Sequence, residues 1–298
     1  MTANSPELHG FFNVDKPSGP TSHDLVAQVR RAGGQLKVGH AGTLDPFASG
    51  VLVICVGRGT RLAEEITPGR KRYRAGIILG VETDTYDRDG QVVARQPVST
   101  TRSQVETVAA SLLGAFKQIP PMYSAIKVGG RKLYEIARSG ATVERAAREV
   151  EIYRLDVLDW TPPRILVDIE CSKGTYVRSI AHDIGVTLGT GGHLDELIRT
   201  GSGDFRLADS VSLEQLVEDL RQGTGARWLI PLDHPVTYLP AIVLDQDQLR
   251  VFTTGQVLRD IDDPTPGRPR ARVYGSDGWL KGLAERVSTG WTPSKVFA

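Results

Sequence analysis

One short segment of the chain combines a carboxylate with the glycines that let a backbone come close to a ligand. Residues 39–50 contain Asp45, His40 and three glycines, and glycine adopts backbone conformations that other residues avoid. Pro46 biases Asp45 towards an extended conformation. A continuous apolar run follows at residues 51–56 and is typical of a buried strand. The pattern predicts a loop that presents Asp45 to a ligand, although an aspartate before a proline also starts many ordinary turns.

A second segment places an arginine where a helix is expected to begin. Residues 164–171 alternate apolar and polar side chains as a strand does, and Gly174 favours a turn. Apolar residues at helical spacing follow over residues 177–184, with Arg178 in the first turn, where the helix dipole disfavours a positive charge. We therefore expect a carboxylate or another anion to recruit Arg178, the alternative being a surface arginine. His182 is expected to pack or to lie at the surface.

Other patterns that often mark a site fail when their spacing is checked. Gly57 and Gly59 follow an expected strand, but the last glycine and the later acid of a dinucleotide fingerprint are missing. The acids of residues 84–90 do not have the spacing of a calcium loop. The chain has 2 cysteines, Cys55 and Cys171, too few for a disulfide framework or a cysteine-built zinc site. We expect no metal and no cofactor.

The charged residues are balanced in total but segregated along the chain. Lys and Arg number 36 and Asp and Glu 35. Basic residues exceed acidic ones in residues 58–74 and 116–148, whereas acidic residues dominate residues 204–247. Solvated faces with local counterions explain such clusters in many proteins. The alternative is a basic working surface for a polyanion, with an acidic remainder that faces away.

The elements around the two segments predict the fold class. We expect strands at residues 10–14, 51–56, 71–79, 149–160 and 164–171. Helices are expected after capping boxes at Thr21 with Asp24 and at Ser103 with Glu106, and also near residues 132–138, 177–184 and 212–222. Because the strands are half-exposed, the chain is predicted to be α+β, with a mixed, largely antiparallel sheet flanked by helices.

The order of these elements predicts two folded parts. Residues 1–9 form a loose leader, residues 10–227 a large domain with a basic, irregular insertion at about 120–148, and residues 228–298 a small β-rich domain. The longest aliphatic run, residues 51–56, is far shorter than the roughly 18 apolar residues of a membrane span. The first residues lack the pattern of a signal peptide. These features and the few cysteines favour a cytoplasmic protein without a membrane partner.

The segment at residues 39–50 strongly resembles the signature of the TruB family, the tRNA pseudouridine-55 synthases. It reads Gly39-His40-x-Gly42-x-Leu44-Asp45-Pro46-x-Ala48-x-Gly50. Further motifs lie in the expected order: Asp15-Lys16-Pro17 with Gly19 and Ser22, Lys71-Arg72-Tyr73, Pro120-Pro121-Met122-Tyr123-Ser124-Ala125, Cys171-Ser172-Lys173-Gly174-Thr175-Tyr176-Val177-Arg178, and Arg199-Thr200 with Gly203 and Phe205. The resemblance spans residues 10–210, and the part after residue 228 is similar to a short PUA-type RNA-binding domain.

The resemblance implies a reaction and a set of catalytic residues. The family isomerises one uridine of the tRNA T-loop: the N1–C1′ bond breaks, the base rotates, and C5 bonds to C1′. Asp45 would be the essential carboxylate, adding at C6 or acting at C1′ through a glycal. Arg178 would pair with Asp45 and keep it ionised, and Tyr73 would stack on the base and move a proton.

The resemblance also implies how the substrate is bound. His40, Tyr176, Lys16, Arg131 and Lys132 would contact the RNA, and the basic insertion would grip the phosphates of the T-loop and stem. The target base is stacked in a folded loop, so it must be flipped out at a cost of a few kcal/mol. No cofactor and no protein partner is implied, and a monomer is expected.

Two other functional classes stay open on the residues alone. A carboxylate-dependent hydrolase would need a second acid near Asp45, and Asp84, Asp87 and Asp183 are the candidates. It would release a free base instead of retaining an isomerised one. A non-catalytic RNA chaperone would bind tRNA equally well without Asp45 and would leave the base unchanged.

Overall fold

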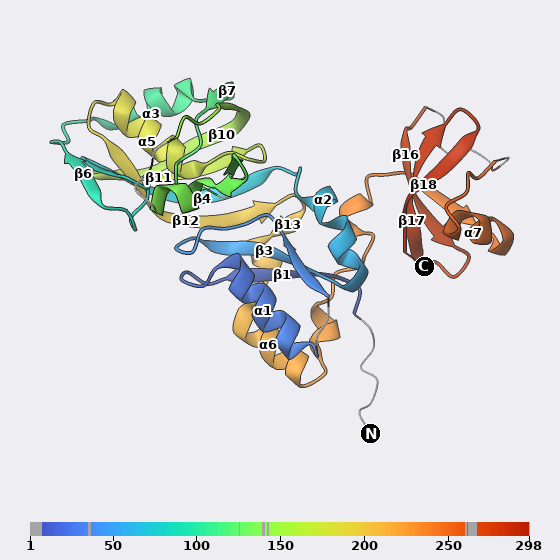
Figure 1. Cartoon of the computed structure of the whole chain (residues 1–298). Coiled ribbons are helices and arrows are strands. Elements are labelled where there is room, and N and C mark those ends of the chain that lie inside the picture. Colours follow the sequence, from blue (N-terminus) through green and yellow to red (C-terminus); the bar gives the residue numbers. More distant parts are fainter. Residues whose placement is uncertain are drawn as a thin grey trace.

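A large mixed sheet organises residues 10–212 (Figure 1). The structure is a computed structural model, and it describes residues 8–34, 37–124, 126–138, 141, 143–259, 261 and 267–297. The sheet has 10 strands: β1 (Gly10–Lys16), β2 (Val38–Ala41), β3 (Ser49–Val56), β4 (Lys71–Leu79), β7 (Gly114–Gln118), β10 (Arg148–Thr161), β11 (Arg164–Cys171), β12 (Gly192–Ser202), β13 (Phe205–Arg206) and β14 (Val211–Ser212).

The order of the strands puts β3 and β12 near the middle of this sheet. The path is β14-β1-β3-β12-β4-β11-β10-β7, with β2 paired to β3 and β13 paired to β12. Only two of the pairings, β1 with β14 and β3 with β12, are parallel among the strands of this sheet. The expected mixed, largely antiparallel α+β sheet is confirmed, and the apolar run in β3 is buried as predicted.

Helices cover the two halves of the sheet separately. They are α1 (Ser22–Ala32), α2 (Ala63–Ile66), α3 (Arg102–Ser111), α4 (Leu133–Arg138), α5 (Val177–Thr187) and α6 (Leu213–Arg221), with short 3-10 helices η1 (Gly57–Leu62), η2 (Leu207–Asp209), η3 (Gly225–Trp228) and η4 (His234–Val236). Helices α1 and α6 share a core with β1 and β3, and α3 and α5 share one with β4, β10 and β11. No helix in the described ranges is long and apolar enough to span a membrane.

Helix capping confirms one of the expected helix starts and corrects another. The capping box of Thr21 with Asp24 opens α1 as predicted. The expected box of Ser103 with Glu106 is wrong: α3 is capped by Thr101, with Gln104 as the reciprocal residue. Helix α3 ends at Ser111, and Gly114 begins strand β7. The pair two positions earlier forms the box instead. Thr101 supplies a hydroxyl as Ser103 would, and the Gln104 carboxamide accepts the hydrogen bond that the Glu106 carboxylate would accept.

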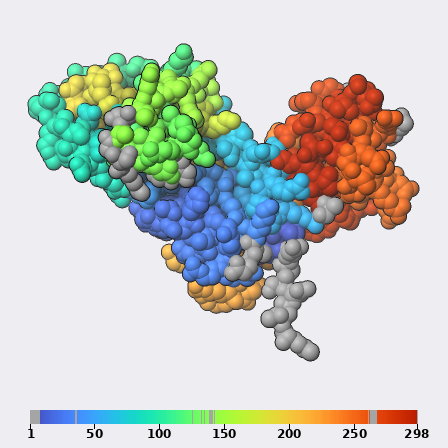
Figure 2. Space-filling view, in the orientation of Figure 1, coloured from blue at the N-terminus to red at the C-terminus, as the bar shows by residue number. Residues whose placement is uncertain are grey.

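Two hairpins lie outside the main sheet. The hairpin of β5 (Val81–Thr83) and β6 (Val92–Arg95) follows β4 directly. The hairpin of β8 (Lys127–Val128) and β9 (Arg131–Lys132) lies in the basic insertion, where the expected short helix near residues 132–138 is α4. In the space-filling view the insertion, coloured green, lies over the blue N-terminal part of the large domain (Figure 2).

The C-terminal part forms a separate small lobe (Figure 1). It consists of β15 (Ala241–Leu244), α7 (Gln246–Thr253), β16 (Arg270–Gly275), β17 (Leu280–Val287) and β18 (Gly290–Val296). The four strands make one sheet with its own core, which includes Phe252 and Trp291. The expected β-rich character of this part is confirmed.

The C-terminal lobe is joined to the large domain through α2. The Glu65 carboxylate accepts hydrogen bonds from Arg270 Nη2 at 2.6 Å and from the Tyr238 hydroxyl at 3.3 Å. The Tyr274 hydroxyl donates to Asp233 at 2.7 Å. Helix α2 lies just before β4, so the lobe contacts an element that leads directly into the central sheet.

A buried carboxylate at the end of α6 fixes the start of the linker to this lobe. Asp219 is 3% exposed and accepts hydrogen bonds from Trp228 Nε1 at 2.7 Å and from Gln215 Nε2 at 3.1 Å. Arg227 forms an ion pair with the same carboxylate. These contacts, led by the Trp228 hydrogen bond, lower the pKa of Asp219 to about 2. The ionised carboxylate therefore stabilises the fold at neutral pH.

Asp219→Asn should lower the midpoint of thermal unfolding at neutral pH, because the carboxamide replaces one acceptor oxygen with an NH2 donor, and the groups around this side chain are all donors. A carboxyl group with a depressed pKa stabilises the fold above its ordinary pKa and loses that effect as the pH falls towards the native value. The difference between wild type and variant should thus shrink between about pH 4 and pH 2. Glu218→Gln, an exposed neighbour, is the control; an equal effect there would contradict this account.

Candidate active site

The loop between β2 and β3 carries Asp45, and a buried lysine holds it in place. Lys16, at the end of β1, is fully buried. Its ammonium group donates hydrogen bonds to the carbonyl oxygens of Pro46 at 3.0 Å, Ala48 at 2.7 Å and Pro17 at 2.9 Å. Carbonyl oxygens inside a protein need such donors. The expected contact of Lys16 with the substrate stays a prediction, and the geometry favours a role in holding the loop.

The turn after Lys16 adds three more contacts to the same loop. Gly19 N donates to the Pro46 carbonyl at 2.8 Å, and the Ser18 hydroxyl donates to the Phe47 carbonyl at 2.8 Å. The Ser22 hydroxyl accepts from Leu44 N at 3.0 Å. The backbone on both sides of Asp45 is therefore tied down, and its side chain is left to project from the loop.

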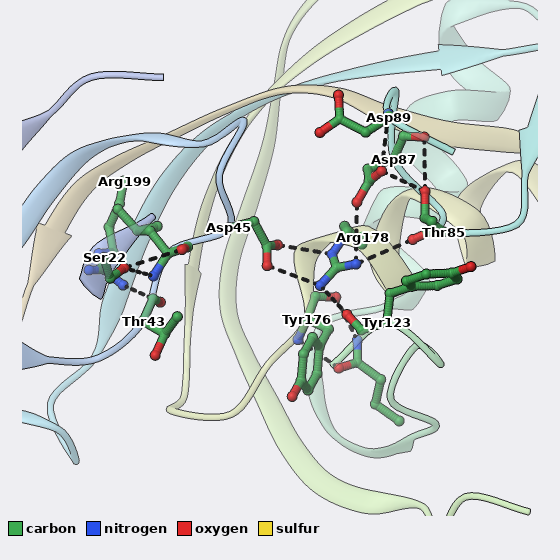
Figure 3. Close-up of polar contacts among 12 residues, drawn as sticks. Ser22, Thr43, Asp45, Thr85, Asp87, Asp89, Tyr123, Tyr176, Arg178 and Arg199 are labelled. Atoms are coloured by element: carbon green, nitrogen blue, oxygen red, sulfur yellow. Dashed lines mark hydrogen bonds and ion pairs between the residues drawn. The ribbon is translucent and has the colours of Figure 1, made fainter. Parts of the chain in front are cut away.

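Asp45 and Arg178 meet as the sequence predicts. Arg178 Nε lies 2.9 Å from Asp45 Oδ2, and Arg178 Nη2 lies 3.1 Å from Asp45 Oδ1 (Figure 3). This two-point contact fixes the plane of the carboxylate as well as its position. The Arg178 side chain is 5% exposed and the Asp45 side chain 33%. The arginine is thus buried behind a carboxylate that keeps an open side.

Arg178 is itself held from the side opposite Asp45. Its Nη1 lies 3.2 Å from the Asp87 carboxylate and donates to the Thr85 carbonyl at 3.4 Å. Its Nη2 also donates to the Tyr123 carbonyl of the insertion at 2.9 Å. Figure 3 shows the guanidinium between the two carboxylates. The orientation of Arg178, and through it that of Asp45, depends on two separate segments of the chain, the β5–β6 hairpin and the insertion.

A strained turn in the β5–β6 hairpin delivers Asp87 to this position. Tyr86 has a φ of 62°, which is rare for a residue with a side chain. Its ring stacks on His182 of α5, with centroids 3.9 Å apart and an interplanar angle of 13°. His182 is therefore a packing residue, as expected. Burial raises the pKa of Asp87, while the Thr85 hydrogen bond and the Arg178 charge act in the opposite direction.

Tyr73 lies in the core beside this group. It is 9% exposed and packs in the same cluster as Leu44 and Phe47 of the Asp45 loop. Burial raises the pKa of its phenol to about 12, and the positive charge of Arg199 acts against that effect. At neutral pH the phenol is protonated, so it can donate a hydrogen bond.

His40 and Tyr176 flank the loop on two sides. His40 is half-buried in β2, and its ring meets the exposed His23 ring edge-on at 5.3 Å. Burial, followed by the neighbouring His23, lowers the pKa of His40. Tyr176 caps α5, and its backbone N–H donates to Gln118 Oε1 at 2.8 Å. Both rings thus come from elements anchored in the main sheet or its helices.

The two basic residues expected to bind RNA lie in the insertion. Arg131 is exposed on the β8–β9 hairpin. Lys132 belongs to the same strand, and its side chain lies outside the described residues. No group of three or more His, Cys, Asp or Glu side chains that could hold a metal occurs in the portion of the chain that the structure describes.

Two residues of the site carry no role in the sequence analysis or only an alternative one. The sequence predicts Asp87 only as a candidate second acid of a hydrolase, and Asp87 lies beside Arg178. Arg199 belongs to a family motif without a predicted role, and it is buried against the Asp45 loop. No local pattern in β12 singles it out, because polar residues such as Asp195, Glu196 and Thr200 lie in the same strand.

The chain matches known families over most of its length. Residues 30–177 match the TruB family pseudouridylate synthase N-terminal domain, and residues 178–246 match the tRNA pseudouridylate synthase B C-terminal domain. The chain is 44% identical over 285 residues to tRNA pseudouridine synthase B of Geobacillus thermodenitrificans, covering 90% of this chain and 94% of that protein. It is 42% identical over 295 residues to the protein of the same name from Trichormus variabilis, covering 97% and 99%.

Solved structures share the fold. A crystal structure of a Cbf5-Nop10-Gar1 complex matches with a TM-score of 0.74 and 25% identity, covering 97% of this chain and 85% of that one. An H/ACA RNP bound to a substrate RNA containing 2′-deoxyuridine matches with a TM-score of 0.72 and 23% identity, covering 99% and 92%. At these identities the likeness supports the architecture of the sheet and its helices.

Asp87→Asn should slow the chemical step by about tenfold or more, the range seen when a partner that orients a reacting group is lost. The carboxamide keeps the shape of Asp87 but removes one of the two charges that hold Arg178. Asp89→Asn, two residues away with an exposed side chain, is the matched control. Single-turnover rates of both variants decide the matter: equal rates would contradict the orienting role of Asp87.

Proposed function

The chain belongs to the TruB family of pseudouridylate synthases, and we propose that it converts uridine 55 in the T-loop of tRNA into pseudouridine, with Asp45 as the nucleophile. The bacterial relatives at 42–44% identity are named tRNA pseudouridine synthase B. The observation that carries the proposal is the Asp45–Arg178 pair, a fixed and partly exposed carboxylate backed by a buried guanidinium.

The geometry suits a carboxylate that reacts with a nucleoside. Arg178 contacts both carboxylate oxygens of Asp45, and carboxylates form covalent intermediates at anomeric carbons in retaining glycosidases. The open side of Asp45 can reach C1′ of the ribose or C6 of the base. Both routes use the same residues. In each, the glycosidic bond breaks, the base rotates, and a new C5–C1′ bond forms.

Three rings around the loop supply what a flipped base needs. Tyr73 would lie against the base; once the new C5–C1′ bond has formed, the proton on C5 would pass to the phenol oxygen while the phenol releases its own proton to water. His40 would occupy the space that the base leaves in the RNA, and Tyr176 would contact the nucleotide beside α5. Burial lowers the pKa of His40 and thus favours the neutral imidazole, which suits such a gap.

A hydrolase reaction is disfavoured by the surroundings of its candidate second acids. Asp87 is 6% exposed and already engaged by Arg178 and Thr85, so it cannot activate water at the open side of Asp45. Asp84 accepts a hydrogen bond from Gln91 N within its own hairpin. Asp183 lies on α5, near His182. Isomerisation needs only one reactive carboxylate.

The insertion supplies the surface for the RNA phosphates. Lys127 and Arg131 are exposed on the β8–β9 hairpin, and the Tyr123 carbonyl at the base of the same insertion contacts Arg178. Binding of the RNA backbone to the hairpin would therefore affect the position of Arg178. Shape and splayed bases, more than base-edge contacts, are the usual basis of such RNA recognition.

Asp45→Asn should retain RNA binding and lose turnover by about 10⁴-fold or more, as expected for the only nucleophile of a reaction. The substrate is a T-arm transcript, and carbodiimide mapping locates the pseudouridine. Wild-type protein should modify position 55 alone. Asp209→Asn, an exposed acid on η2, is the control and should keep full activity. Residual activity of Asp45→Asn within about tenfold of wild type would remove Asp45 from the mechanism.

Replacing Lys127 and Arg131 with Ala should weaken RNA binding and flatten the dependence of log K on log salt by one to two units, since each phosphate contact contributes about 0.7–0.9. Chemistry at saturating RNA should change little. The matched control replaces Arg221 and Arg250, exposed arginines on α6 and α7. An unchanged salt slope for the Lys127 and Arg131 variant would show that the insertion is not the clamp.

A further inference from the structure

A buried arginine on the central strand of the sheet joins the two halves of the proposed site. Arg199 is 1% exposed and lies on β12, between β3 and β4. Its partner on β4 is Tyr73, directly opposite in the antiparallel register, and its partner on β3 is Gly50. Residues directly opposite in antiparallel strands have side chains on the same face, about 5 Å apart at Cβ. Arg199 therefore lies beside Tyr73.

The guanidinium of Arg199 holds the first half of the Asp45 loop. Its Nη2 donates to the Gly42 carbonyl at 3.1 Å and its Nη1 to the Thr43 carbonyl at 3.2 Å (Figure 3). Its Nε donates to the Val51 carbonyl, just after the loop, at 2.6 Å. Lys16 holds the other half of the loop through the carbonyls of Pro46 and Ala48. The two cations thus fix the loop on both sides of Asp45.

The backbone around Arg199 leaves no room for another arrangement. Gly50 has a φ of 97°, and a Cβ atom there would lie 2.3 Å from the Arg199 carbonyl oxygen. The glycine at position 50 therefore allows β3 and β12 to approach, and this approach brings the Arg199 side chain under the loop.

Stability alone does not explain this arginine. It donates hydrogen bonds to the carbonyl oxygens of Val51, Thr43 and Gly42, and no ion pair with a carboxylate is found for it within the described ranges. A buried cation without a carboxylate partner is costly to desolvate. Its electrostatic attraction is instead to Tyr73 and Asp45, the two groups of the proposed reaction. The free-energy cost of burying the Arg199 charge is explained if this charge positions the groups of the proposed site.

We propose that Arg199 is a positioning residue for the isomerisation: it sets the Tyr73 phenol at a fixed place relative to the Asp45 loop. This rests on the proposed function. The planar guanidinium can bind the two loop carbonyls and Val51 while facing the phenol, which a lysine ammonium on a flexible stem cannot do. A misplacement of about 1 Å at a reacting group can cost about 100-fold in rate.

The test combines Arg199→Lys and Arg199→Gln with Tyr73→Phe in a double-mutant cycle. Single-turnover pseudouridine formation is measured on a saturating T-arm transcript, together with RNA affinity and thermal unfolding. Arg199→Gln should slow chemistry by about 100-fold with RNA affinity within about threefold of wild type, and Arg199→Lys should lie between. In the Tyr73→Phe background the effect of either change should be at least about fivefold smaller, because part of it acts through the phenol.

The control is Arg206→Gln on the neighbouring strand β13. Arg206 also donates to backbone carbonyls, those of Gly203 and Phe205, but contacts neither the Asp45 loop nor Tyr73. The single-turnover rate of the Arg206→Gln variant should stay close to that of wild type. If Arg199→Gln does not fold, Arg199→Lys keeps the charge and carries the test.

Three results would decide against the proposal. Rates of folded Arg199 variants within about threefold of wild type would overturn it. So would effects of Arg199 and Tyr73 changes that simply multiply, because a purely structural arginine would not couple to the phenol. Wild-type protein that forms no pseudouridine would instead remove the proposed function, and this proposal with it.

Discussion

The site depends on how an irregular loop satisfies its backbone carbonyl groups away from water. The Asp45 loop has neither helix nor sheet hydrogen bonds along most of its length, and buried carbonyls without donors are destabilising. Lys16 and Arg199 solve this from opposite sides, each with three contacts to carbonyl oxygens. Because their donors bind backbone carbonyls, neither cation forms a hydrogen bond with the Asp45 side chain. That side chain remains for Arg178 and for a substrate.

The group of Asp45, Arg178 and Asp87 has a buried side and a side open to solvent. Arg178 and Asp87 are nearly inaccessible, whereas a third of the Asp45 side chain is exposed. Arg178 is held by the β5–β6 hairpin and the insertion, so the segment proposed to bind RNA also orients the Asp45–Arg178 pair. The Coulomb attraction of Asp45 to Lys16 and Arg199 adds to that of Arg178. Three cations around one carboxylate also suit an anionic substrate.

Many of the strands and site contacts can be predicted from the sequence, and those that cannot be predicted have physical causes. The spacing of apolar residues predicts β3, β4, β10 and β11, and the position of Arg178 in a first helical turn predicts a carboxylate partner. Strand β12 escapes detection because bulges between Leu194 and Glu196 and between Arg199 and Gly201 break its alternation. Asp87 reaches Arg178 only through the strained Tyr86 turn, which no pattern indicates. Long-range pairing of strands, not local spacing, places Arg199 beside Tyr73.

The fate of the base is the most direct test of the account. A T-arm transcript carrying uridine with tritium at C5 is incubated with the wild-type protein, and both released tritium and free uracil are measured. If Asp45 drives an isomerisation in which C5 replaces N1, one equivalent of tritium per RNA leaves for water and all of the base stays in the RNA. Free uracil in amounts equal to the reacted RNA would mean hydrolysis, and an unaltered transcript bound by the protein would mean RNA binding without catalysis. Either result would contradict the account.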